Sequence, residues 1–162
     1  MSRGRAFIAS ACFCIAVPAS AQPNEDINKL IEVFASVCLE NAGNVTAQIA
    51  GASDFFSGPT QESQRVIAFR SANQRLEISP KDRSCFVTSS VSSDTSFGFA
   101  LSAVRDKLGA DEGQQLNDPG SRGWLLAAGE EEFVMALSVG VTDGQNLATL
   151  LIQPRAALSE NE

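Results

Sequence analysis

The sequence predicts an α+β domain in which an N-terminal helix and a mid-chain helix pack on a mainly antiparallel sheet of five to seven strands. Two segments repeat apolar residues at helical spacing, whereas the segments after residue 65 and after residue 122 alternate with a period of two. The connections between the alternating segments are short. Short connections join antiparallel neighbours, and a sheet of this kind packs its helices on one face.

The first 21 residues have the three parts of a secretory signal. Arg3 and Arg5 precede an apolar run over residues 6–17, and Ala19-Ser20-Ala21 forms an A-x-A cleavage site before Gln22. We therefore predict a cleaved signal peptide at residues 1–21. One small globular domain with a frayed C-terminal tail then occupies residues 22–162, in the periplasm or secreted.

Two other interpretations of this segment fit less well. A bilayer-spanning helix needs about 20 apolar residues, and the run over residues 6–17 is much shorter. A lipoprotein signal would end at Cys12 or Cys14, but neither cysteine has leucine three residues earlier. The sequence thus predicts no stable membrane insertion after cleavage.

Signal removal changes the charge of the protein. The full chain has a formal net charge of −7, and loss of Arg3 and Arg5 would make it −9. An acidic balance disfavours general binding to nucleic acid, which requires clustered lysine and arginine. It favours solubility and a basic protein or envelope component as the partner.

Cleavage would also reduce four cysteines to two, Cys38 and Cys85. Oxidising compartments pair such thiols, so we predict a Cys38–Cys85 disulfide, worth about 4 kcal/mol in chain entropy. A redox or nucleophilic thiol is the alternative. There is no C-x-x-C motif and no histidine to act as base, so the structural disulfide is favoured.

Helical spacing predicts a first helix over residues 24–42, capped by Asn24 and ended by Gly43. Asn44 can cap a shorter helix over residues 45–50 that stops at Gly51. Asn44 also begins an N-x-T sequon, which matters only in a eukaryotic secretory pathway. Residues 52–64 are expected to form a loop, with Phe55 and Phe56 packed on the core; an exposed binding pair is the alternative.

Three strands follow, around residues 65–69, 76–78 and 84–91, and place the Cys85 face of the third strand toward the first helix. A helix capped by one of residues 93–96 should end at Gly109, followed by a polar loop over residues 110–122. Strands at 123–128, 132–142 and 147–153 complete the domain, with a tight turn at Asp143-Gly144. The order resembles two three-strand units, each preceded by helix.

The chain lacks several residue types that usually carry out catalysis. The chain has no histidine and no tyrosine, which excludes Ser-His-Asp and Cys-His mechanisms and removes the commonest zinc ligand. Phosphate-binding glycine loops are also absent from the sequence. We therefore assign no catalytic, cofactor-binding or metal-binding residue and expect no cofactor.

Charged and aromatic residues leave four alternatives open. Glu130-Glu131-Glu132 could bind calcium, although a solvated hairpin tip is favoured. Asp111 and Glu112 with Asp118 could form an acidic hydrolase pair. Trp124 should pack in the core or at a sheet edge rather than stack on a ligand. The basic residues around the first hairpin could bind an anion or a partner, or they could serve only as a charged strand edge that blocks edge pairing. They are Arg65, Arg70, Arg75, Lys81 and Arg83.

The sequence thus predicts an exported, non-enzymatic domain that binds a protein or envelope component, with oligomeric state unspecified. The alternative is a carboxylate-dependent hydrolase of the periplasm that uses Asp111, Glu112 and Asp118.

Overall fold

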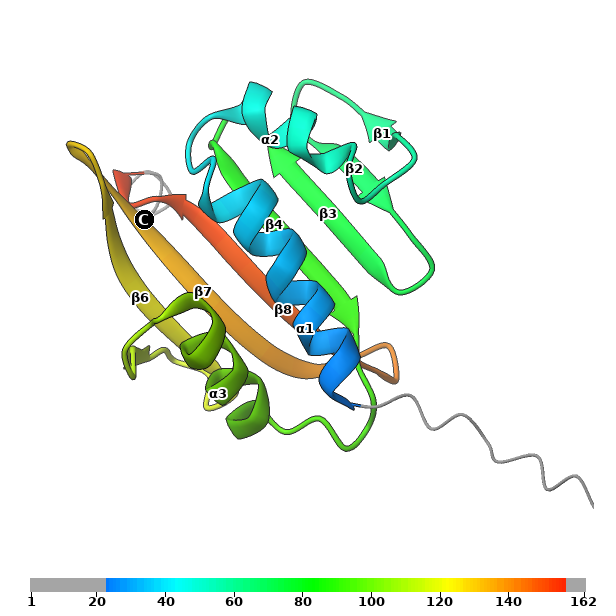
Figure 1. Ribbon diagram of the computed structural model, residues 1–162, viewed down its shortest axis with the longest axis vertical. Helices are drawn as coiled ribbons and strands as arrows, with labels where there is room; N and C mark the ends of the chain where they lie inside the picture. The colour runs from blue at the N-terminus through cyan, green and yellow to red at the C-terminus, as the bar shows by residue number, and fades with distance from the viewer. Residues whose placement is uncertain (1–22, 157–162) are drawn as a thin grey trace, which may run out of the picture.

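The protein is an α+β structure with helices on one face of a single antiparallel sheet, as predicted (Figure 1). The computed structural model describes residues 23–156. The predicted signal peptide, its cleavage site at Ala21 and Gln22, and the tail at residues 157–162 lie outside the described residues. Within residues 23–156, no helix has both the length and the apolar character of a membrane span.

Two of the helices begin after residues that the sequence identifies as caps, whereas the first begins at Pro23, one residue before the predicted cap Asn24. Asn44 Oδ1 accepts a hydrogen bond from the Ala47 amide at 3.1 Å, and Ser96 Oγ accepts one from the Phe99 amide at 3.2 Å. The second helix continues through Gly51, where it was expected to stop. The helical elements are α1 Pro23–Val33, η1 Phe34–Leu39, α2 Val45–Ala52 and α3 Phe97–Leu108.

The first helix departs from the predicted continuous α-helix over residues 24–42. From Phe34 it widens into the π-helix η1, in which the Glu40 amide bonds to the Ala35 carbonyl, five residues back, at 3.0 Å. The wider turn changes which backbone carbonyls accept a hydrogen bond within the helix. The Asn41 side-chain amide Nδ2 donates to the backbone carbonyls of Ser36 (2.9 Å) and Val37 (3.3 Å), which satisfies this end of the helix.

Eight strands form the sheet, in the order β1-β2-β3-β4-β8-β7-β6-β5. Each half is a four-strand meander preceded by helix, and the halves join where β4 pairs with β8. At the β7–β8 turn, Asp143 (φ 51°) and Gly144 (φ 77°) are both left-handed, as a type I′ hairpin requires. The strands are β1 Pro59–Glu62, β2 Ile67–Arg70, β3 Gln74–Ser79, β4 Ser84–Ser90, β5 Gln114–Gln115, β6 Ser121–Ala128, β7 Glu131–Thr142 and β8 Gln145–Pro154.

The predicted count of five to seven strands was too low, and the three-strand units are four-strand units. The two missed strands, β1 and β5, lie at the two edges of the sheet, inside segments predicted to be loops. Both are short, polar and exposed. An edge strand with two solvated faces has no alternation of apolar residues, so the periodic pattern could not reveal them.

The helices cover only one face of the sheet. α1 lies across β4 and β8, α2 contacts β3 and α3 contacts β7 (Figure 1). The side chains beneath them are apolar and fully buried, including Leu76, Val87 and Leu150. Phe56 also packs here, with its ring 5.9 Å from that of Phe69, which confirms the predicted packing of this aromatic residue. The other face of the sheet carries no helix among residues 23–156.

The predicted cysteine pair lies at the centre of this helix–sheet interface. Cys38 in η1 and Cys85 in β4 are at disulfide distance, with their Cα atoms 5.6 Å apart, and both are fully buried. The Cys85 face of β4 points to the first helix, as predicted from the alternation of that strand. The disulfide therefore fixes the N-terminal helical segment over the middle of the sheet.

Candidate functional site

One edge of the sheet is incompletely paired. β6 pairs with β7 along its whole length, but its outer neighbour β5 reaches only Arg122 and Gly123. The remaining outer edge, residues 124–128, has no strand partner in the described part of the chain, and we call it the β6 edge. In an antiparallel strand alternate residues direct their N–H and C=O groups outward, so this edge presents a row of hydrogen-bonding groups.

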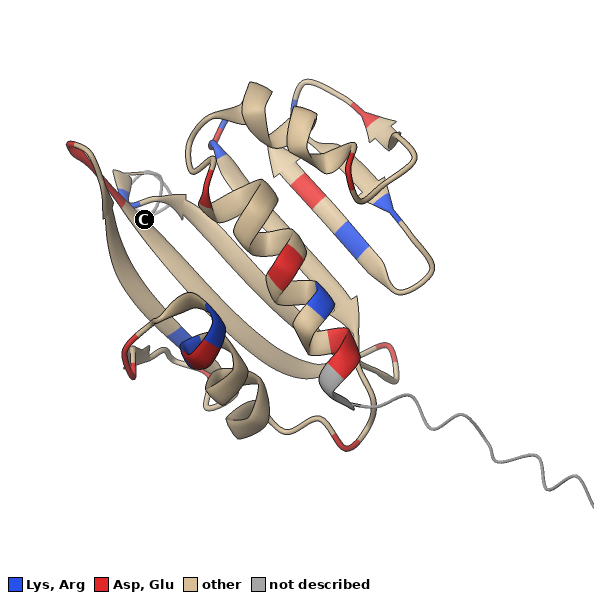
Figure 2. Cartoon of the chain, in the orientation of Figure 1, with Lys and Arg blue, Asp and Glu red and all other residues tan. Residues whose placement is uncertain are grey.

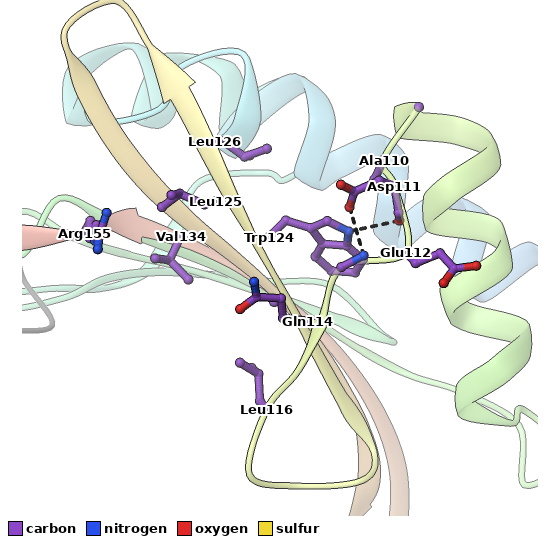
Figure 3. A pocket seen from close by; sticks show the side chains of 13 residues that line it. Ala110, Asp111, Glu112, Gln114, Leu116, Trp124, Leu125, Leu126, Val134 and Arg155 are labelled. Atoms are coloured by element: carbon purple, nitrogen blue, oxygen red, sulfur yellow. Dashed lines mark hydrogen bonds between the residues drawn. The ribbon is translucent and has the colours of Figure 1, made fainter.

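A groove of about 980 Å³ runs along the β6 edge. Leu125 projects from β6 on the helix-free face beside Val134 and is 55% exposed, while Leu126 projects on the opposite side (Figure 3). Leu116 adds a second exposed apolar side chain from the segment after β5. The groove thus offers apolar contacts on both sides of an unpaired strand.

Trp124 lies at the β5 end of the groove, which we call the closed end. Its indole N–H donates to the Asp111 carbonyl at 3.1 Å, and the Asp111 carboxylate accepts from the Gly113 amide at 2.9 Å (Figure 3). Gly113 has φ +65°, and a Cβ there would lie 2.7 Å from the indole. Glycine is therefore required both for the turn and for contact with the ring. Trp124 is 6% exposed, consistent with the predicted packing role.

Acidic residues border both ends of the β6 edge. Glu112 is highly exposed beside the closed end, 3.9 Å from Arg105, and the β6–β7 tip carries Glu130, Glu131 and Glu132 (Figure 2). Glu131 pairs with Arg83, and Glu132 pairs with Arg155 at 2.7 Å. Glu130 is the glutamate at this tip that forms no ion pair among the described residues, and Arg155 also lines the groove.

Two of the three carboxylates that the hydrolase alternative would use, Asp111 and Asp118, have partners in local turns. The Asp111 carbonyl contacts Trp124, whereas the Asp118 carboxylate accepts from the Gly120 amide at 2.9 Å. Each carboxylate stabilises its own turn through a backbone amide, which is a structural use of aspartate.

The glutamates considered for calcium bind arginines instead. Two of the three, Glu131 and Glu132, have Arg83 and Arg155 as partners. Across residues 23–156, no cluster of three acidic or cysteine side chains is arranged to hold a metal ion.

Two groups on α1 have shifted pKa values. On α1, the hydrogen bond from Lys29 and its positive charge lower the pKa of Glu25, and the same contact raises the pKa of Lys29. Both groups are exposed and lie at (i, i+4) spacing, so they support the helix surface.

The β6 edge was not recognised from the sequence, although the strand itself was predicted. Two consecutive apolar residues, Leu125 and Leu126, gave the available signal, because one of them must lie on the face away from the helices. The exposure of the edge depends on the shortness of β5, which the polar pattern of residues 110–122 does not reveal. Comparison with known protein families, curated proteins and solved structures finds no match to this chain.

Proposed function

We propose that the protein is an exported, non-enzymatic binding module that takes up an extended segment of a partner protein along the β6 edge. The pattern of residues 1–21 and the buried Cys38–Cys85 pair support export. The observation that carries the binding proposal is the unpaired outer edge of residues 124–128 beside an apolar groove.

Strand addition uses both features of this edge. The backbone of an incoming segment pairs with the outward N–H and C=O groups, and its alternate side chains enter pockets on the two faces. On the helix-free face, these side chains would contact Leu116 and Leu125. On the other face, they would lie beside Leu126 and the indole of Trp124.

The acidic residues at the two ends of the β6 edge, which we call the rim, favour a basic partner segment. Glu112 and Glu130 lie at the two ends of the edge, and the full chain carries a net charge of −7. Complementary charge accelerates encounter and disfavours acidic partners. The expected ligand is therefore an extended segment that alternates basic with apolar residues, and its affinity should fall as salt screens these charges.

The test uses a labelled seven-residue peptide in which lysine alternates with valine, and a counterpart with glutamate in place of lysine. We expect saturable binding of the lysine peptide, measured by fluorescence anisotropy, and slower hydrogen exchange at amides within residues 125–128. Absence of binding, equal binding of both peptides, or unchanged exchange at the β6 edge would overturn the proposal.

Two pairs of variants locate the binding. Leu125→Asp places a charge in the groove, and Val141→Asp makes the same change at an apolar residue 69% exposed at the far end of β7. Glu112→Lys reverses the rim charge, and Glu62→Lys makes that reversal on the opposite edge strand β1. Only the Leu125 and Glu112 variants should weaken the lysine peptide. Concentration-dependent dimerisation with protection of the same amides would instead identify a second copy of the chain as the occupant.

A further inference from the structure

A second hollow, of about 590 Å³, lies on the helix-free face at the other side of the sheet. It occupies the end of the sheet where β2 begins, β3 turns into β4 and β8 approaches its last residue. Gln153 of β8 lines this hollow and pairs with Val134 of β7, which lines the groove at the β6 edge, so the two sites adjoin but have no lining residue in common. The residues that matter for its chemistry are Arg65, Lys81, Ser84, Phe86 and Gln153.

The hollow contains two of the basic residues that the sequence places around the first hairpin. Arg75 pairs with Glu77, and Arg83 pairs with Glu131. Arg65 and Lys81 instead line the hollow, and neither forms an ion pair within the described chain. Their positive charges are therefore available to a ligand.

One acidic residue also lines the hollow, but it is engaged in the local turn. The Ser79 hydroxyl donates to Asp82 Oδ2 at 2.8 Å, and Ser79 is itself buried. This contact directs one oxygen of the carboxylate to the β3–β4 turn. The lining keeps an excess of positive charge, because Arg65 and Lys81 face this single carboxylate.

Neutral donors complete the lining. The Ser84 hydroxyl and the Gln153 side-chain amide both line the hollow. A hydroxyl and a side-chain amide can each donate a hydrogen bond to an anion. Phe86 supplies an apolar wall beside these donors.

We propose that this hollow is an oxyanion-binding site for a small phosphorylated ligand that carries a ring or other flat apolar group. The guanidinium of Arg65, the ammonium of Lys81 and the hydroxyl of Ser84 donate to the anionic oxygens. Charge-assisted hydrogen bonds of this kind are stronger than neutral ones. The apolar part of the ligand lies against Phe86. This inference is independent of the proposed binding at the β6 edge.

The test compares inorganic phosphate with phenyl phosphate, at constant ionic strength, by isothermal titration calorimetry and by chemical shifts of residues around Ser84. We expect phenyl phosphate to bind about threefold to tenfold more tightly, because its ring contacts Phe86. Phe86→Ala should remove that advantage and leave the affinity for inorganic phosphate unchanged. Equal affinity of the two probes would overturn the role of Phe86.

Charge variants decide whether the site is specific. Lys81→Gln should weaken both probes on the order of threefold to tenfold. Arg70→Gln removes the same charge at an exposed arginine outside the hollow and should have no effect. Ser84→Ala should also weaken both, with thermal unfolding used to establish that the variant folds. No saturable binding to the native protein, or equal losses for Lys81→Gln and Arg70→Gln, would overturn the site.

Discussion

Cys38 and Cys85 join the π-helix η1 to β4, at the point where the N-terminal helical segment crosses the sheet. Both cysteines are fully buried, and they lie 47 positions apart in the sequence. The loop between them contains α2 and the first three strands, so the bond restricts nearly the whole first half of the domain in the unfolded state. A bond with this placement contributes mainly to stability.

Removal of the disulfide should cost about 4 kcal/mol of unfolding free energy, from the chain-entropy estimate for a loop of this length. The variant is the double substitution Cys38→Ala and Cys85→Ala, and urea denaturation measures the change. The native protein in reductant should show a similar loss. If reductant leaves the denaturation midpoint of the native protein unchanged, the bond is not formed or does not stabilise the fold.

A matched pair of glycines tests how the closed end of the groove is built. Gly113 and Gly129 both have φ +65°, but only at Gly113 would a Cβ meet Trp124, at 2.7 Å; Gly129 has open space around it. Gly129→Ala should therefore cost only the left-handed backbone penalty, about 1 kcal/mol. Gly113→Ala should cost at least twice as much, because the indole must also move.

Fluorescence gives this comparison a direct readout, since Trp124 is the single tryptophan of the chain. Gly113→Ala should shift its emission to longer wavelength as the indole leaves the Asp111 carbonyl, and Gly129→Ala should not. Identical spectra and equal losses of stability for the two variants would show that Gly113 does not determine the position of the ring.

Local chemistry made much of the fold predictable. Asn44 and Ser96 begin helices because their side-chain oxygens satisfy free amides, and the alternation around Cys85 fixes which face of β4 is buried. The π-helix was missed because Phe34, Val37 and Cys38 have a spacing that also suits an α-helix.

The candidate sites were harder to predict, since each depends on where strands end relative to one another. The β6 edge beyond Gly123 is unpaired because β5 begins at Gln114, and Lys81 lines the same hollow as Gln153 because β4 pairs with β8. Both relations are long-range pairings. The sequence pattern of a single strand contains no information about its neighbour's length.

Gln48 provides a last test of the packing between α2 and the rest of the helical layer. Its side chain is fully buried, and neither Oε1 nor Nε2 has a hydrogen-bond partner in the described structure. A buried polar group without a partner costs about 1–3 kcal/mol. Methionine has a similar shape and no such group, so Gln48→Met should raise the free energy of unfolding by about 1 kcal/mol or more.

Urea denaturation measures this change, with Gln64→Met as the control because Gln64 is exposed and the same substitution there should have little effect. A loss of stability in Gln48→Met alone would show that the amide is satisfied in solution, by an internal water that bridges Oε1 and Nε2 to the surrounding backbone. A gain in the free energy of unfolding would show that apolar packing holds α2 in place, although the Gln48 side-chain amide has no hydrogen-bond partner.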